Sequence, residues 1–476
     1  MIPTRHRDQR LDIDSVFALE NAASLLREKL VQTFESLFSG THSLDQLYLQ
    51  RLEIAIPEID PLEWLQNQPF SEKLYLEDRD GSYRVAGIGL ADQILAKKAC
   101  DLSPLFSIIR ERLKQVEGHA RYFGGMRFNG LRPSDASWQQ FGFFRFTLPR
   151  FEILQEEGNT FFACNLLIRP GEDIRSVYRK TLSELEQVVF AKTGEGHDLP
   201  RLLHREDFPS QEQWHNQILH LLHAFDRHEV EKVVLARKSV FTFSDRLEAI
   251  CLLRRLRAAN PHLFYFYFQP SREEAFLGGS PERLYRRIGH QIKSEAIAGT
   301  RPRGQTIDED QRLGRELLES EKDQREHRFV LDTIRQTLEQ FCHTVDIDNE
   351  VSLLKLARVQ HLCCRLQGVL HDRVNDVDLL KALHPTPAVG GSPTSRALQA
   401  IRELEPFDRG WYAGPVGWLG ADAAEFVVAI RSGLVQGNTL SLFSGAGIVQ
   451  GSTPEAEWQE IENKISNFMK IFHLPC

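Results

Sequence analysis

The residues of this sequence best suited to acid–base chemistry are a lysine in a predicted strand and a glutamate in a predicted turn. Lys232 begins the segment KVVLARK, whose alternation predicts a β-strand with Lys232 on the face of Val234 and Ala236. A lysine that faced inward there would be desolvated, which favours the neutral amine that a general base requires. Glu282 follows a Gly-Gly-Ser-Pro turn and could donate a proton. Both residues also fit a purely structural role, a strand-end lysine that reaches water and an ordinary turn carboxylate.

Two predicted helices each carry a pair of carboxylates at helical spacing. Asp323 and Glu326 lie three residues apart in SEKDQREHRFV, and Glu457 and Glu460 lie three apart in STPEAEWQEIENKISNF. Two such pairs could together hold Mg²⁺, which prefers oxygen ligands. Each pair taken alone is equally typical of a charged, solvent-exposed helix face, and spacing does not show that the two helices meet.

Several well-known catalytic motifs are missing from the sequence. It contains no G-x-x-x-x-G-K-[ST], no H-E-x-x-H and no G-x-S-x-G. The segment around Gly445 and Gly447 comes nearest to a dinucleotide fingerprint, but the next glycine is Gly451 instead of residue 450. This spacing disfavours a nicotinamide site.

Composition predicts a globular intracellular protein. The 476 residues carry a net charge of −8, so we expect neither a nucleic-acid nor an anionic-membrane surface. No apolar run approaches the ~20 residues of a membrane span, and the N-terminal MIPTRHRDQR lacks the apolar segment of a secretory signal. The seven cysteines are odd in number and form no C-x-x-C, which argues against a disulfide framework or zinc ribbon and favours the cytoplasm.

The elements that must position these residues alternate between helices and strands. We expect a helix followed by a strand in residues 1–60, one long helical stretch over 308–341, and a final helix from about residue 454. Strands are expected at 411–419, 425–435 and 439–449. Many strand pairs are joined by short turns, which favours a mixed α+β fold.

Taken together, these segments resemble the chorismate-utilising enzymes, which include isochorismate, salicylate, anthranilate and aminodeoxychorismate synthases. Their order and spacing agree over residues 205–470. The matching segments are KVVLAR (232–237), GGSPERL (278–284), SEAIAGTRPRG (294–304), SEKDQREH (320–327), VQHLCCRLQG (359–368), LHPTPAVGG (383–391), RGWYAGPVGW (409–418), FVVAIRS (426–432) and FSGAGIVQGSTPEAEWQEIENK (443–464).

The resemblance implies a large two-sheet α+β sandwich flanked by helices. Residues 205–472 would form the chorismate-binding catalytic region, and residues 1–204 would complete the scaffold as part of the same structural unit. It further implies Mg²⁺ as cofactor, chorismate as substrate, and a monomer or weak dimer.

The subgroup can be argued from residue chemistry within the family. Ala298 stands where aminodeoxychorismate synthases commonly have a nucleophilic lysine, and Lys232 stands where anthranilate synthases usually have glutamine. Water, unlike ammonia, needs a base, so Lys232 favours water as nucleophile and no glutamine amidotransferase subunit is expected. The PTPAVGG loop then favours isomerisation of chorismate to isochorismate. The alternatives are a salicylate synthase, which also eliminates pyruvate, and a catalytically silent chorismate-binding protein.

The resemblance also implies a role for each candidate residue. Glu326 and Glu460 would bind Mg²⁺, with Asp323 and Glu457 holding metal-bound waters. Lys232 would activate water for addition at ring C2, and protonated Glu282 would donate to the departing C4 hydroxyl. The substrate would be lined by Gly299, Thr300, His361, Ala388, Val389, Tyr412, Arg431, Gly445, Gly447 and Lys464. Arg431, expected in a strand, would bind the enolpyruvyl carboxylate. The sequence leaves open whether isochorismate goes to a quinone, a siderophore or salicylate.

Overall fold

The computed structural model describes residues 13–39, 46–114, 116, 118–130, 132–190 and 199–473. The N-terminal segment discussed above lies outside these residues. The helices are α1 (Ile13–Phe38), α2 (Pro61–Gln66), α3 (Ser103–Leu113), α4 (Ile174–Leu185), α5 (Gln211–Asp226), α6 (Ala249–Ala259), α7 (Ile307–Glu319), α8 (Glu321–Glu339), α9 (Asp376–Leu383), α10 (Thr394–Leu404) and α11 (Pro454–Met469), with short 3₁₀ turns η1 (Ala136–Trp138) and η2 (Lys470–His473).

The strands form one continuous hydrogen-bonded network whose described pairs are all antiparallel. They are β1 (Tyr48–Ala55), β2 (Lys73–Glu77), β3 (Tyr83–Ala96), β4 (Tyr122–Met126), β5 (Phe144–Glu156), β6 (Asn159–Ile168), β7 (Leu202–Phe208), β8 (Lys232–Phe243), β9 (Phe264–Ser271), β10 (Glu274–Ser280), β11 (Arg283–Ile288), β12 (Gln291–Pro302), β13 (Cys342–Ile347), β14 (Ser352–Lys355), β15 (Val359–Leu370), β16 (Gly391–Ser392), β17 (Pro415–Leu419), β18 (Ala423–Val428), β19 (Ser432–Gln436) and β20 (Thr439–Val449).

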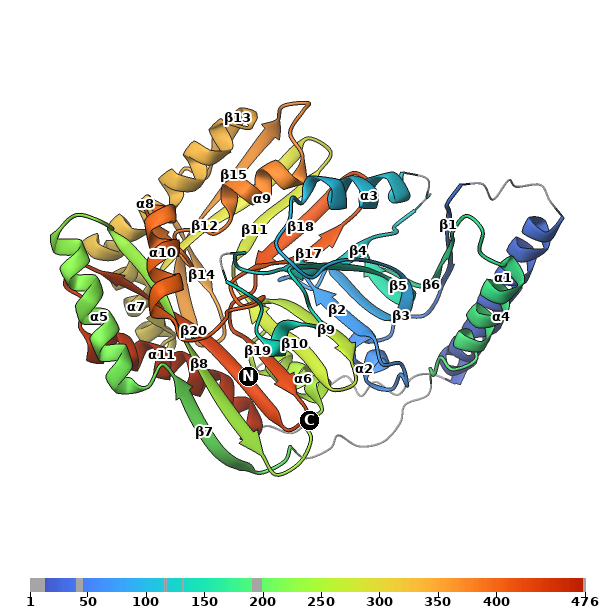
Figure 1. Cartoon of the computed structure of the whole chain (residues 1–476), viewed down its shortest axis with the longest axis horizontal. Helices are drawn as coiled ribbons and strands as arrows, with labels where there is room; N and C mark the ends of the chain where they lie inside the picture. The colour runs from blue at the N-terminus through green and yellow to red at the C-terminus, as the bar shows by residue number, and fades with distance from the viewer. Residues whose placement is uncertain are drawn as a thin grey trace.

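The network has two long arms that meet at β5. One arm runs β7–β8–β20–β19–β10–β9–β2–β3–β5, and the other runs β4–β17–β18–β11–β12–β15. β4 pairs with the start of β5 and joins the arms. Segments from both parts of the chain pair directly, since β2 lies beside β9 and β4 beside β17. The helices flank this sheet (Figure 1), and the predicted α+β class is confirmed.

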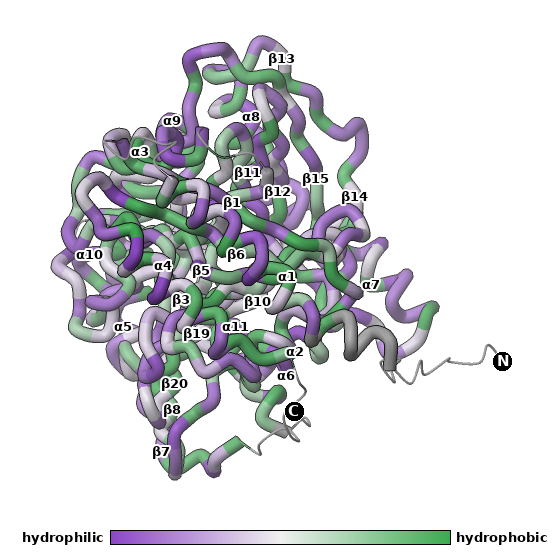
Figure 2. The backbone as a smooth tube through the Cα atoms, turned by 90° about the vertical axis from the view of Figure 1, so that its right-hand side faces the viewer, coloured by the Kyte–Doolittle hydropathy of each residue, from purple (hydrophilic) through white to green (hydrophobic). Residues whose placement is uncertain are grey.

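Aromatic side chains from the two arms pack against each other in the core. Tyr83 of β3 lies 5.9 Å from Trp418 of β17 between ring centroids, and Phe276 of β10 lies 6.3 Å from Trp411. Figure 2 shows hydrophobic segments gathered along the central strands and hydrophilic ones along outer helices and connections. No helix within the described ranges combines the length and apolarity needed to cross a membrane.

The helical stretch expected over 308–341 is two helices, so this prediction is wrong in one respect. Ser320 takes an extended conformation between α7 and α8, and its side chain accepts a hydrogen bond from the backbone N–H of Asp323. A serine followed three residues later by an acid is a helix N-terminal signal. This cap starts a new helix and sets the orientation of the residues that follow it.

The strands expected at 411–419 and 425–435 are also shorter than predicted. β17 begins only at Pro415, and a tight connection separates β18 from β19. Arg431 lies in that connection with φ of +52°, in the left-handed region that non-glycine residues seldom adopt. The expectation that Arg431 belongs to a strand is therefore wrong. The backbone turns between the end of β18 and the start of β19, so the Arg431 side chain does not follow the alternation of either strand.

Candidate active site

Lys232 lies at the start of β8 with 8% of its surface exposed. Its Nζ donates to Oε1 of Glu326 on α8 at 3.1 Å, so the candidate base and a candidate metal ligand form an ion pair. Gly447 of β20 lies alongside, where an added Cβ would stand 3.1 Å from the Lys232 Cε. A side chain at position 447 would therefore crowd the lysine, which gives a physical reason for glycine there.

Glu282 lies in the turn between β10 and β11 and is also 8% exposed. Its Oε1 accepts a hydrogen bond from the Thr386 hydroxyl at 3.0 Å, and its backbone N–H donates to the Ser280 hydroxyl. Burial raises the pKa of Glu282 to about 7, although Thr386 and the nearby charge of Lys232 act to lower it. A carboxyl that titrates near neutrality can act as a proton donor at physiological pH.

The four candidate metal ligands come from the N-terminal half of α8 and from α11. Glu326 accepts from Lys232, Asp323 accepts from Arg301 at 2.7 Å, and Glu460 accepts from Lys464 at 2.7 Å. Glu457 is half-buried; burial raises its pKa, and the negative charge of Glu460 adds to the rise.

The donor chemistry of this group suits a hard divalent cation, because it offers carboxylate oxygens only. The mutual repulsion between Glu457 and Glu460 would be relieved by added positive charge. In the side-chain arrangement described, no three His, Cys, Asp or Glu residues of the described ranges converge closely enough to ligate a metal. Lysine and arginine side chains pair with Glu326, Asp323 and Glu460, and the Ser452 hydroxyl donates to Glu457, so a bound cation would compete with these contacts.

A partly buried arginine and a buried histidine form a further part of the site. The Arg431 Nη2 donates to Nε2 of His361 on β15 at 3.1 Å, and the His361 Nδ1 lies 3.0 Å from the Thr300 hydroxyl and 3.2 Å from the Gly299 carbonyl oxygen. Because Nε2 accepts from a guanidinium, the proton of the neutral ring belongs on Nδ1, where the Gly299 carbonyl accepts it.

Burial disfavours the charged form of both His361 and Arg431 and so lowers the pKa of each. It lowers the pKa of His361 to about 3, with the Arg431 charge contributing, and lowers the pKa of Arg431 to about 10. Arg431 therefore stays charged at neutral pH while His361 stays neutral. No carboxylate of the described residues lies within ion-pair distance of Arg431. A partly buried cation without a carboxylate partner is suited to bind an anionic ligand.

Three further predicted residues meet at β20. The Lys464 Nζ donates to the Gly445 carbonyl oxygen at 2.9 Å, which connects α11 to the strand. A Cβ on Gly445 would stand 3.2 Å from the Tyr412 hydroxyl oxygen. Tyr412 is buried and stacks on Phe443 with a centroid distance of 5.3 Å. These contacts place Gly445, Tyr412 and Lys464 together.

Ala388 and Val389 belong to the loop that carries Thr386. The backbone N–H of Val389 donates to the Thr386 carbonyl oxygen, and the Val389 carbonyl oxygen accepts from Arg409. No described contact joins Ala388 or Val389 to Lys232 or Glu282. Sequence reasoning selected this loop but missed Thr386, the residue that touches Glu282. The threonine inside PTPAVGG, the only hydroxyl of that segment, was the available signal.

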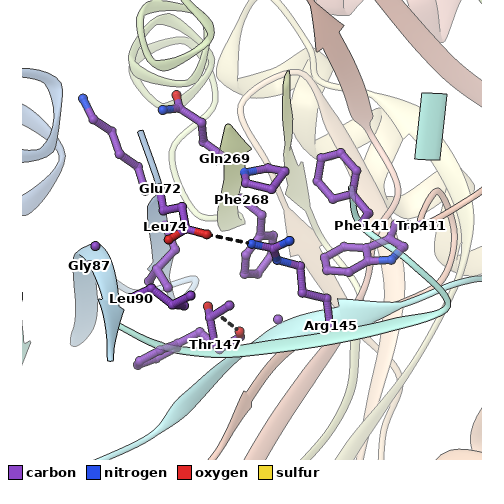
Figure 3. A pocket seen from close by; sticks show the side chains of 15 residues that line it. Glu72, Leu74, Gly87, Leu90, Phe141, Arg145, Thr147, Phe268, Gln269 and Trp411 are labelled. Carbon is purple, nitrogen blue, oxygen red and sulfur yellow. Dashed lines mark hydrogen bonds and ion pairs between the residues drawn. The ribbon is translucent and has the colours of Figure 1, made fainter. Parts of the chain in front are cut away.

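A small pocket elsewhere in the fold is lined by none of the predicted site residues. It lies among β2, β3, β4, β5 and β9, with Phe141, Phe268 and Trp411 as aromatic walls (Figure 3). Its buried Arg145 is paired with Glu72 at 3.2 Å, as the dashed line in Figure 3 shows. The pocket is thus distinct from the cluster around Lys232 and Glu282.

Comparison with known proteins gives one consistent result. Residues 36–473 match the family model described as chorismate binding enzyme. The chain is 36% identical over 398 residues to isochorismate synthase 2, chloroplastic, of Arabidopsis thaliana, covering 81% of this chain and 70% of that one. It is 34% identical to isochorismate synthase MenF of Pasteurella multocida, covering 86% and 90%. The solved structure of MenF, the menaquinone-specific isochorismate synthase from Escherichia coli, superposes with a TM-score of 0.84 at 28% identity, covering 95% of this chain and 100% of that one.

Proposed function

The chain belongs to the chorismate-binding enzyme family and has the isomerase activity of an isochorismate synthase, and on this premise we propose that Lys232 and Glu282 perform its two proton transfers. The feature that supports these roles is the buried carboxyl of Glu282, whose pKa burial raises to about 7, near enough to the buried Lys232 to be influenced by its charge. A base and an acid that act on one substrate must hold opposite protonation states at the same pH, so their surroundings must differ.

The two proton transfers serve the addition of one water and the loss of another during the isomerisation. Lys232 accepts a proton from water as the water oxygen forms a bond to ring C2. The ring double bonds shift, the bond from C4 to its hydroxyl breaks, and Glu282 donates the proton with which that hydroxyl departs as water. Water added equals water lost, so isochorismate is an isomer of chorismate. Each proton transfer contributes about 10²–10⁴-fold to the rate.

Arg431 and the groups around it would recognise the substrate carboxylates. Its guanidinium is partly buried and charged, and His361, which Thr300 contacts, accepts a hydrogen bond from it and so orients it. The fork geometry of arginine favours bidentate binding of a carboxylate, such as that of the enolpyruvyl group. Lys464 adds a second positive charge near the ring.

We propose Mg²⁺ as the cofactor, held by Glu326 and Glu460 with Asp323 and Glu457 next to them. When bound, the cation would neutralise the ring carboxylate of chorismate and orient it. The carboxylate-only donor set of α8 and α11 supports this proposal. The residues of the chain supply the proton transfers and hold the remaining parts of the substrate.

Replacing Glu460 with glutamine is expected to raise the Mg²⁺ concentration for half-maximal activity by at least about tenfold, since a neutral amide is a weaker ligand than a carboxylate. Isothermal titration calorimetry with Mg²⁺ alone measures the same loss without turnover. Glu455→Gln is the matched control, because Glu455 lies on α11 but is exposed and pairs with His215. An unchanged Mg²⁺ titration of the Glu460 variant would remove this residue from the metal site.

The product of the reaction tests the function itself. Incubation of the protein with chorismate and Mg²⁺, followed by chromatography, is expected to give isochorismate in equilibrium with chorismate. Formation of salicylate together with pyruvate would overturn the isomerase assignment in favour of the alternative with a lyase step. Unchanged chorismate would instead support the silent binding protein.

We also propose that the enzyme works in the cytoplasm without a glutamine amidotransferase subunit, as a monomer or weak dimer. Water as nucleophile supports the first point, because no ammonia has to be supplied. The sequence, with an odd number of cysteines and no C-x-x-C, supports the reducing compartment.

A further inference from the structure

Two partly buried arginines and two buried glutamates form an ion-pair quartet behind the Glu282 turn. Arg79, in the connection between β2 and β3, places its guanidinium on both carboxylate oxygens of Glu295 at 2.6 and 3.3 Å. Arg283 donates to Glu295 at 3.2 Å and to Glu425 of β18 at 2.9 Å. Two positive and two negative charges cancel, so the quartet is neutral as a whole.

The quartet holds both neighbours of Glu282 along the chain. The Arg79 Nη2 also donates to the carbonyl oxygen of Pro281, the residue before Glu282. Arg283, the residue after Glu282, is the second arginine of the quartet. Both guanidinium groups lie over the ring of Phe264, at 4.7 and 5.0 Å from its centroid. Phe264 therefore fixes the plane in which the two arginines approach the turn.

We propose that Arg79 and Glu295 are positioning residues for Glu282: the neutral quartet holds the Glu282 turn in place and determines the net charge behind its carboxyl. The inference rests on the proposed role of Glu282 as proton donor. It assigns a part in the reaction to Arg79, which lies 216 residues before Glu295 in the chain and outside the proposed catalytic region of residues 205–472.

The direction of the electrostatic effect follows from the signs of the charges. Glu295 acts to raise the pKa of Glu282. Removing Arg79 leaves the quartet with one net negative charge, which disfavours the Glu282 carboxylate; neutralising Glu295 leaves one net positive charge, which favours it. The charged or polar groups that face Glu282 or border the quartet are Lys232 of β8, Thr386 of the loop before β16, Glu295, Arg79, Arg283, Glu425 and Asp78.

The test is the pH dependence of kcat at saturating chorismate and Mg²⁺. A proton donor fails above its pKa, so the alkaline limb reports the pKa of Glu282. Arg79→Gln is expected to move this limb upward by about half a unit to one unit, and Glu295→Gln to move it downward by a similar amount. The double variant restores neutrality, and its limb is expected to return to the wild-type position.

Two control variants distinguish a failure of the positioning role from a failure of the proposed role of Glu282 as proton donor. Arg84→Gln removes an arginine from β3 that pairs with Glu77, outside the quartet, and is expected to leave the limb in place. Glu282→Gln is expected to abolish the limb; if it does not, the proposed acid is wrong. If Glu282→Gln abolishes the limb while the Arg79 and Glu295 variants leave it unmoved or shift it in the same direction, the positioning role is overturned. Glu295→Gln preserves side-chain shape, so its downward shift alone decides the matter if Arg79→Gln does not fold.

Discussion

Replacing Lys232 with alanine is expected to lower kcat by about 10²–10⁴-fold, the contribution of a positioned general base. The substitution removes the only buried amine that both pairs with a candidate metal ligand and reaches Glu282 electrostatically, among the residues described. The measurement is steady-state formation of isochorismate at saturating chorismate and Mg²⁺. A kcat within a few-fold of wild type would contradict the role as base.

Loss of activity must be distinguished from loss of the metal. Without Lys232, Glu326 has no ion-pair partner to give up, so calorimetric Mg²⁺ affinity is expected to be unchanged or higher. A weaker Mg²⁺ affinity would mean that the lysine supports the metal site instead of the chemistry. Lys238→Ala is the matched control on the same strand, where the side chain lies over Phe208 away from the site.

The ion pair between Lys232 and Glu326 also has a consequence for how the site works. A proton acceptor needs a free lone pair, whereas the Lys232 amine donates a hydrogen bond to the Glu326 carboxylate at 3.1 Å. The same carboxylate is a proposed metal ligand and cannot serve both partners fully. If Glu326 binds a cation as proposed, it pairs less fully with Lys232, and the proposed base is then freer to accept a proton from water.

Local features of the site could be predicted from the sequence because they depend on short-range periodicity. Ile461, Ile465 and Phe468 recur at helical spacing and are buried in α11, with Trp458 partly buried beside them, and the same spacing places Glu457 and Glu460 on one helix face. Ser320 carries a capping signal as well, since an acid follows three residues later, and this signal marks the point that divides the stretch at 308–341 into two helices.

The remaining features could not be predicted because no local pattern encodes them. Arg431 adopts a positive φ that is unusual for its residue type, so nothing in FVVAIRS indicates a turn. The contact of Thr386 with Glu282 spans 104 residues, and that of Arg79 with Glu295 spans 216. Such contacts depend on the pairing of distant strands, which spacing along the chain does not determine.

Replacing Glu282 with glutamine is expected to lower kcat by about 10²–10⁴-fold as well, and to remove the alkaline limb of the pH profile. Glutamine keeps the shape and can still accept the Thr386 hydrogen bond, but it has no proton to transfer to the leaving hydroxyl. In the wild type the pKa of Glu282 is about 7, so the protonated fraction, and with it kcat, is expected to fall about tenfold per unit well above that pH.

Thr386→Val provides a second and gentler test of the same group. The threonine hydroxyl donates to the Glu282 carboxylate and thereby lowers its pKa, so removing the hydroxyl is expected to shift the alkaline limb upward. The acid would then stay protonated to higher pH, and activity at pH 8 would fall less than in the wild type. A limb that stayed in place in Thr386→Val and persisted in Glu282→Gln would belong to another group, and the search for the proton donor would have to move to a different residue.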